Sequence, residues 1–191
     1  SEDVKDYLQK LDFEKVEGML LGNGDGSFGA KTDFVTGSHP RSVALADLNG
    51  EGKLDMVVAK NNSRTASVLL GHGDGSFAAR TEFGTGTYPT SVVVHDVNAD
   101  GKLDLAVTSS GSFAISVLLG SGTGSFGAKT DFGTGASPQS VAVADMNADG
   151  KPDLVVANTG SSTLTVLLNK GSSVSVGPKP GPARFELAPP Y

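Results

Sequence analysis

A unit of 49 residues occurs three times in this chain, and a repeat of that length restricts the fold to a few repeat architectures. The copies span residues 22–70, 71–119 and 120–168 of a chain of 191 residues. Each copy contains an acidic loop at the same offset, which reads DLNGEGKLD, DVNADGKLD and DMNADGKPD. The sequence therefore predicts a repeat protein with the same loop chemistry in every unit.

Each unit contains four short runs that are rich in β-branched residues. In the second copy they are residues 91–97, 103–108 and 114–119, and a fourth lies near Phe126 and Phe132. Clusters of Gly, Ser, Asn and Asp separate the runs, which is typical of strands and turns. Four strands in a unit of this length indicate a β-propeller blade. We expect an all-β fold of three complete four-stranded repeats plus a partial one, because residues 17–34 match only the second half of a unit.

The two ends differ from the repeats. Residues 1–16 place Val4, Tyr7, Leu8 and Leu11 at helical spacing, so we expect a short N-terminal helical segment. Residues 17–176 form the partial propeller in this interpretation. Residues 177–191 hold five of the nine prolines, which favours a stiff linker or tail.

Charge and composition exclude several classes of function. The net charge of -6 does not suit nucleic-acid binding, which needs clustered Lys and Arg. The chain contains no cysteine, so disulfides and thiol catalysis are excluded. It also lacks the long apolar run that a membrane-spanning segment needs. The three histidines lie at unrelated repeat positions, and no Ser-His-Asp arrangement recurs. We therefore expect a protein that is not an enzyme.

The acidic loops have the chemistry of a cation site. Positions 1, 3, 5 and 9 carry side-chain oxygens, position 7 offers a backbone carbonyl, and Gly at position 6 permits a sharp turn. Oxygen ligands without His or Cys favour calcium over transition metals. The candidate ligands are Asp47, Asn49, Glu51, Lys53 and Asp55 in the first loop, Asp96, Asn98, Asp100, Lys102 and Asp104 in the second, and Asp145, Asn147, Asp149, Lys151 and Asp153 in the third.

About three calcium ions, one per repeat, follow from this pattern. An EF-hand is excluded because position 12 is Val58, Val107 or Val156 and strands flank each loop. The alternative is that the Asp and Asn side chains only form turns and accept hydrogen bonds from their own backbone. Glu51 at position 5 of the first loop is one methylene longer than Asp, which makes that loop different from the other two.

These loops resemble the calcium loops of FG-GAP repeats, also called VCBS or integrin-like repeats, with the pattern Asp-x-Asp/Asn-x-Asp-Gly-x-x-Asp. The resemblance extends over residues 17 to about 170. It implies propellers on secreted or cell-surface proteins, in which calcium braces each blade and many members act in adhesion or carbohydrate recognition. Residues 185–191 are similar to the segment that precedes the sorting domain of proteins exported by the bacterial type IX route. An extracellular or cell-surface location on a bacterium is therefore expected.

Three repeats are fewer than a closed ring of this family contains. Either the chain is part of a longer propeller, or several copies assemble as a homo-oligomer. Both alternatives remain open from the sequence.

Recognition residues are expected where the three copies differ. The turns before the innermost strand vary, at residues 38–41, 87–90 and 136–139. The loops after the second strand vary as well, at residues 61–64, 110–113 and 159–162. Aromatic and Arg side chains are enriched in binding sites, so the candidate contacts are His39, Arg41, Arg64, Tyr88 and Phe113. The sequence thus predicts a calcium-stabilised recognition or adhesion module for a glycan or protein ligand. The alternative is a structural subunit that self-assembles through open blade edges into a closed ring or filament.

Overall fold

A computed structural model describes residues 15–172 and 183–188. Every regular element in these ranges is a β-strand, which confirms the expected all-β class. Of the helical segment expected over residues 1–16, residues 1–14 lie outside the described residues, and residues 15–16 belong to the first strand, which begins at Lys15. No helix suited to crossing a membrane occurs in the described part of the chain.

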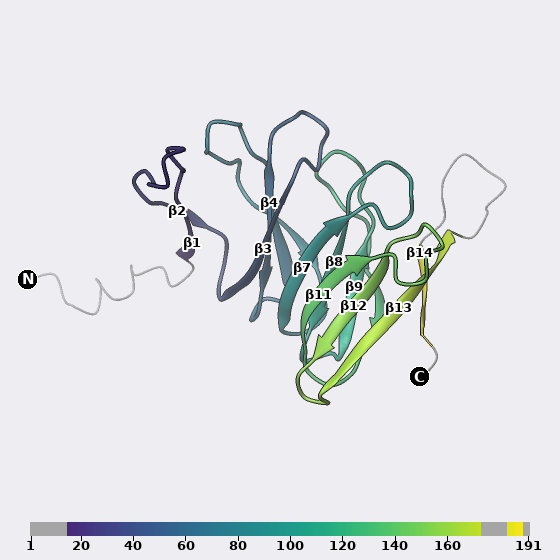
Figure 1. The fold of residues 1–191 in the computed structure, drawn as a ribbon. Coiled ribbons are helices and arrows are strands. Elements are labelled where there is room, and N and C mark those ends of the chain that lie inside the picture. The colour runs from purple at the N-terminus through teal and green to yellow at the C-terminus, as the bar shows by residue number, and fades with distance from the viewer. Residues whose placement is uncertain (1–14, 173–182, 189–191) are drawn as a thin grey trace, which may run out of the picture.

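Three four-stranded antiparallel sheets form the body of the structure (Figure 1). The first contains β3 (Pro40–Ala46), β4 (Asp55–Lys60), β5 (Thr65–Leu69) and β6 (Thr81–Gly84). The second contains β7 (Pro89–His95), β8 (Asp104–Ser109), β9 (Ala114–Leu118) and β10 (Thr130–Gly133). The third contains β11 (Pro138–Ala144), β12 (Asp153–Asn158), β13 (Thr163–Ser172) and β14 (Ala183–Leu187). In each sheet the strands follow one another in chain order, as in the blades of a propeller.

A two-stranded sheet precedes these three. It pairs β1 (Lys15–Met19) with β2 (Thr32–Val35), and Met19 lies opposite Thr32. The third and fourth strands of the first sheet pair in the same way 49 residues later, where Val68 lies opposite Thr81. The β1–β2 pair is therefore the outer half of a blade, as residues 17–34 predicted.

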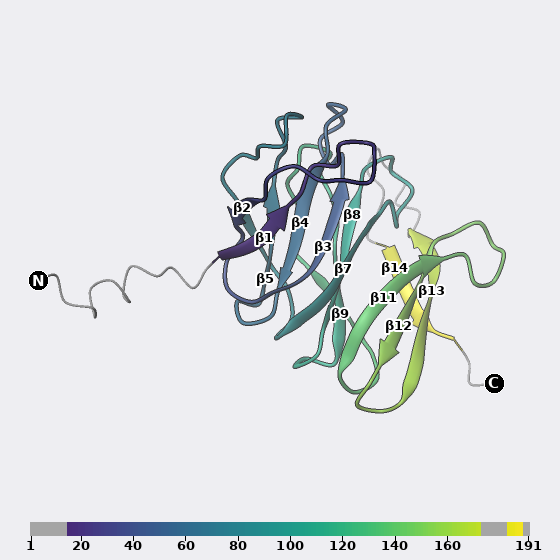
Figure 2. The same ribbon diagram turned by 60° about the vertical axis from the view of Figure 1, so that its left-hand side comes forward.

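Neighbouring sheets pack face to face, because each full sheet is apolar on both sides. We call the face turned toward the following sheet the leading face, and the face turned toward the preceding sheet the trailing face. Val57 and Val68 on the leading face of the first sheet pack with Val92 and Leu105 on the trailing face of the second. The second and third sheets pack in the same way around a cluster that includes Ile115. Figure 2 shows the innermost strands β3, β7 and β11 side by side in this series.

A β-bulge opens each innermost strand. Pro40, Pro89 and Pro138 start β3, β7 and β11, and the pairing register shifts just after each proline. Proline suits the first residue of a strand because it has no N–H to donate to the ladder. In the second sheet the bulge turns Thr90 toward the next sheet, where its hydroxyl donates to the carbonyl of Pro138 at 2.8 Å.

The outer strand of the third sheet comes from residues 177–191, which were predicted from the sequence to be a linker or tail. In the first two sheets an aromatic residue of the glycine-rich turn, Phe77 or Phe126, bridges to Gly71 or Gly120. In the third sheet Asn169 takes the place of Gly71 and Gly120, and it lies opposite Phe185 of β14. Residues 183–187 are therefore part of a blade rather than of a linker.

Phe185 also reproduces the aromatic packing of the other sheets. Phe34 packs edge to face on Phe77 with ring centroids 5.1 Å apart, and Phe83 packs on Phe126 at 5.2 Å. Phe185 makes the same contact with Phe132 at 5.1 Å. A residue outside the repeat thus completes the third blade.

Replacing this ring tests the assignment. Phe185→Ala removes a half-buried side chain and an edge-to-face contact, so we expect a loss of about 2 kcal/mol in the free energy of unfolding. Urea denaturation measures it. Glu186→Ala on the same strand is the control, because its ion pair with Lys170 is exposed and contributes little. Equal stability of the two variants would contradict the role of Phe185.

Candidate metal loops and the opposite loop face

The three acidic loops connect the first and second strands of each sheet, and all three have the same backbone shape. Position 6 is left-handed in every loop, with φ of 81° at Gly52, 80° at Gly101 and 81° at Gly150. Position 4 is left-handed as well, even where it is Ala99 or Ala148. A non-glycine residue in this region costs roughly 1 kcal/mol. The recurrence of the strained turn indicates that the loop is held by its neighbouring contacts.

The first aspartate of each loop organises the turn from within. In the second loop, Asp96 accepts hydrogen bonds from the backbone N–H of Asp100 at 3.1 Å and of Gly101 at 2.8 Å. Asp47 and Asp145 accept the equivalent bonds in their loops. The backbone N–H of Gly52 is the main cause that holds the pKa of Asp47 below its usual value. The Asp47 carboxylate is therefore charged at neutral pH.

The last aspartate of each loop is completely buried. Asp104 accepts from the N–H of Val97 at 3.0 Å within its own loop and from the N–H of Gly120 at 2.8 Å at the exit of β9. Asp55 and Asp153 make the same pair of bonds. Burial raises the pKa of Asp104 to about 6, and the charges of Asp100 and Asp96 act in the same direction. A cation placed among these carboxylates would offset that cost.

The fifth position separates the first loop from the others. Asp100 and Asp149 each accept the N–H of the following lysine at 3.0 Å. Glu51 accepts from the side chains of Asn49 at 2.9 Å and Lys53 at 3.3 Å, as Asp149 also does from Asn147 and Lys151, but it is not paired with the N–H of the lysine. The longer side chain thus turns its carboxylate to neighbouring side chains rather than to the backbone.

The donor set of the loops fits a hard cation. Each loop combines carboxylate, amide and backbone carbonyl oxygens, which is the ligand chemistry of calcium. Among the described residues, no group of three or more His, Asp or Glu side chains is gathered in a metal-binding arrangement. The carboxylates also form the backbone turns that the alternative interpretation predicted. Each carboxylate oxygen has a second lone pair, so the two roles are compatible.

The variable loops lie at the opposite end of the sheets. In the first sheet Ala46 pairs with Asp55 at the end of the acidic loop, whereas Pro40 pairs with Lys60 at the other end. The loops before β3 and after β4 therefore emerge away from the acidic loop. The same register in the other two sheets places all six variable loops on one face, which we call the loop face.

Two non-glycine residues per blade are left-handed on the loop face. They are His39 and Arg64 in the first sheet, Tyr88 and Phe113 in the second, and Ser137 and Ser162 in the third, with φ between 49° and 56°. Glycine would adopt this conformation without strain. The sequence singled out four of these residues by their variation, but nothing in its pattern indicated the left-handed backbone.

The five candidate contacts all lie on the loop face, and all five are exposed. Arg41 occupies the bulge of β3, and the ring of His39 lies 3.1 Å from the side-chain amide of Asn62. Tyr88 and Phe113 come from the second sheet and are 50% and 53% exposed. The Tyr88 ring lies so close over Gly111 that a Cβ there would be 2.5 Å from it. The structure thus provides a basic pair of loops next to an aromatic pair.

Comparison with family models identifies the repeats. A model of the FG-GAP-like repeat matches residues 18–58, 47–107 and 96–156, and a model of the FG-GAP repeat matches residues 137–177. The chain belongs to the FG-GAP repeat family. Each of the three FG-GAP-like matches contains at least one complete acidic loop. No curated protein matches the chain.

A solved structure shares the fold. It comes from a study of specific recognition of non-reducing terminal N-acetylglucosamine by a lectin of Agrocybe aegerita. The TM-score is 0.56 and the sequence identity is 22% over 88% of this chain. The matched region is 45% of the lectin, so this FG-GAP chain spans less than half of that protein.

The buried aspartates should be essential to the blades even without a cation. Asp104→Ala leaves two backbone N–H groups without their acceptor, which should lower the free energy of unfolding by about 2 kcal/mol. Urea denaturation in a chelator measures this loss. Asp74→Ala is the control because its exposed carboxylate accepts only from Ser76. A loss no larger than that of the control would contradict the structural role of Asp104.

Proposed function

We propose that this FG-GAP protein is a non-enzymatic recognition module that binds carbohydrate on the loop face. Calcium in the acidic loops stabilises the blades at the opposite end, and the protein works outside the cytoplasm. Binding and stabilisation are thus assigned to opposite ends of the same sheets. Protein ligands remain the second class of partner for the same face.

The exposed aromatic pair of the second sheet carries this proposal. Tyr88 and Phe113 hold their rings about half exposed on strained, left-handed residues. The same conformation recurs at Ser137 and Ser162, so the turn is common to the blades and the two rings are what the second sheet adds. An aromatic ring offers a flat apolar surface to the C–H face of a pyranose, and the Tyr88 hydroxyl adds a polar contact to sugar hydroxyls.

Two further observations support a carbohydrate ligand. Arg41, Arg64 and His39 are exposed on the neighbouring loops and supply hydrogen-bond donors of the kind that sugar hydroxyls accept. The lectin of similar fold recognises a terminal N-acetylglucosamine, which makes sugars with this terminus the first ligands to test. The fold likeness by itself says nothing of the residues that would bind.

Calcium supports the proposed location as well as the fold. Loops with this set of oxygen ligands bind calcium with moderate affinity. Such sites fill where the calcium concentration is millimolar, which is outside the cytoplasm. The ligand set is supplied by the protein around a tight turn, which suits a structural ion rather than a catalytic one. Bound calcium would offset the repulsion between the buried Asp104 and the charges of Asp96 and Asp100.

Glycan binding is tested with the aromatic pair. We expect the wild-type protein to bind glycans that end in N-acetylglucosamine, and Tyr88→Ala with Phe113→Ala to weaken binding at least about tenfold, or 1.4 kcal/mol. A glycan array followed by isothermal titration measures the affinity. Phe28→Ala is the control, since Phe28 is an exposed aromatic residue at the acidic-loop end. Unchanged binding in the double variant would refute the assignment to the loop face.

Calcium binding is tested by stoichiometry and stability. We expect about three ions per chain, each adding roughly 2.7 kcal/mol of stability at 100 times its dissociation constant. Asp100→Ala should remove one ion, because this side chain is a proposed ligand and its loss costs the fold little more than the hydrogen bond from the backbone N–H of Lys102. The control variant Asp74→Ala should still bind all three calcium ions. Titration calorimetry and melting curves with calcium or chelator give the answer, and an unchanged melting temperature in calcium would refute the proposal.

A further inference from the structure

The two ends of the series of sheets leave complementary faces open. On the leading face of the third sheet, Leu164 is 71% exposed and Ala142 is also exposed. On the trailing face of the first sheet, Val43 and Leu45 are 45% and 56% exposed, and the adjacent Leu54 is 60% exposed. Exposed apolar surface of this extent marks an interaction site.

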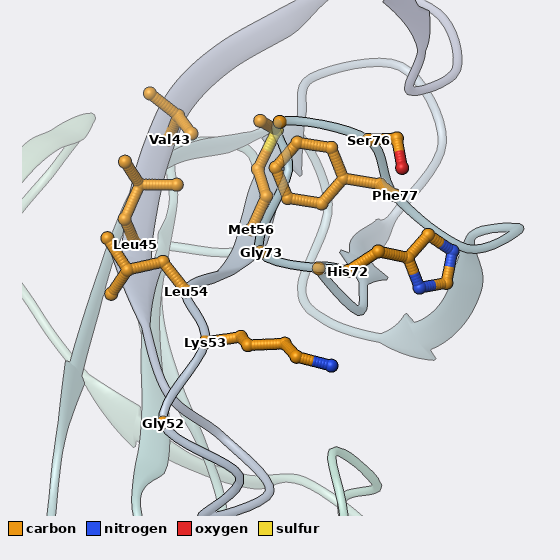
Figure 3. A pocket seen from close by; sticks show the side chains of 12 residues that line it. Val43, Leu45, Gly52, Lys53, Leu54, Met56, His72, Gly73, Ser76 and Phe77 are labelled. Carbon is orange, nitrogen blue, oxygen red and sulfur yellow. The ribbon is translucent and has the colours of Figure 1, made fainter.

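The open part of the first sheet is a groove of about 620 Å³ (Figure 3). Val43, Leu45, Leu54, Met56 and Phe77 line its apolar wall. In Figure 3 the side chains of Val43, Leu45 and Leu54 form one side of this wall, opposite the Phe77 ring. The groove is therefore a surface built for an apolar partner.

The repeats themselves indicate which partner fits. The residues 49 positions after Val43 and Met56 are Val92 and Leu105, which are 4% and 0% exposed. They are covered by the leading face of the first sheet, where small residues such as Ala44 and Ala46 lie on the innermost strand. Ala142 is the residue equivalent to Ala44 on the third sheet. The leading face of the third sheet thus carries the surface that covers this kind of groove.

The β1–β2 pair limits how such a partner can approach. Phe34 of β2 packs on Phe77, and Leu69 of the outer strand β5 is 3% exposed, whereas Val43 and Leu45 of the innermost strand β3 are 45% and 56% exposed. The half blade thus covers the outer strands and leaves the innermost strand β3 open. A partner must contact β3 directly.

We propose that a second copy of this chain docks head to tail, with the leading face of its third sheet on the groove of the first sheet. Ala142 and Val155 of one copy then contact Val43, Leu45 and Leu54 of the other. The interface is heterologous, and two copies close it into a ring.

Sedimentation velocity of the 191-residue chain in calcium tests this inference. The expected species has twice the mass of one chain. Leu45→Glu in the groove and Ala142→Lys on the leading face are exposed substitutions, and each should give a folded monomer. An equimolar mixture of the two variants should form dimers again, because one junction pairs Glu with Lys and the other is unsubstituted.

Ala79→Lys is the matched control, since Ala79 is exposed and lies outside both faces. It should remain dimeric. Circular dichroism checks that every variant is folded. A wild-type monomer at all concentrations, or a dimer that survives both Leu45→Glu and Ala142→Lys, would overturn the proposal. The result does not depend on glycan binding, which is measured on the loop face.

Discussion

The buried aspartate at the end of each acidic loop is the interaction on which the rest of the structure depends. Asp104 joins the N–H of Val97 inside the loop to the N–H of Gly120 beyond β9. One carboxylate therefore fixes the start of the second strand, the acidic loop and the exit of the third strand relative to one another. Because the same bonds recur at Asp55 and Asp153, every blade has the same frame.

This frame produces sheets that are apolar on both faces, and such sheets are stable only in a series. Each leading face needs a trailing face, which is why Val57 and Val68 pack with Leu105 in a common cluster. The series also separates two chemistries, since acidic loops lie at one end of every sheet and variable loops at the other. A uniform end and a variable end suit the recognition role that we propose for the loop face.

Much of this followed from the sequence because the relevant signals are local. The β-branched runs between clusters of Gly, Ser, Asn and Asp located the strands, and the spacing of Asp47, Asn49 and Asp55 located the loops. Other features had no local signal. Phe185 lies outside the repeat, and only its position opposite Asn169 and beside Phe132 reveals that it completes the third blade. The left-handed backbone at Tyr88 could not be predicted from the sequence either, because tyrosine does not favour this conformation.

The sequence by itself determined the repeat, the strand order within a blade and the oxygen-bearing side chains of each loop, because these depend on residues that are close along the chain. The tertiary structure decided which surfaces remain open. Val43 and Val92 occupy the same place in the repeat, yet the first is 45% exposed and the second 4%. The physical reason is that burial of a blade face depends on the neighbouring sheet, and no sequence position within the repeat contains that information.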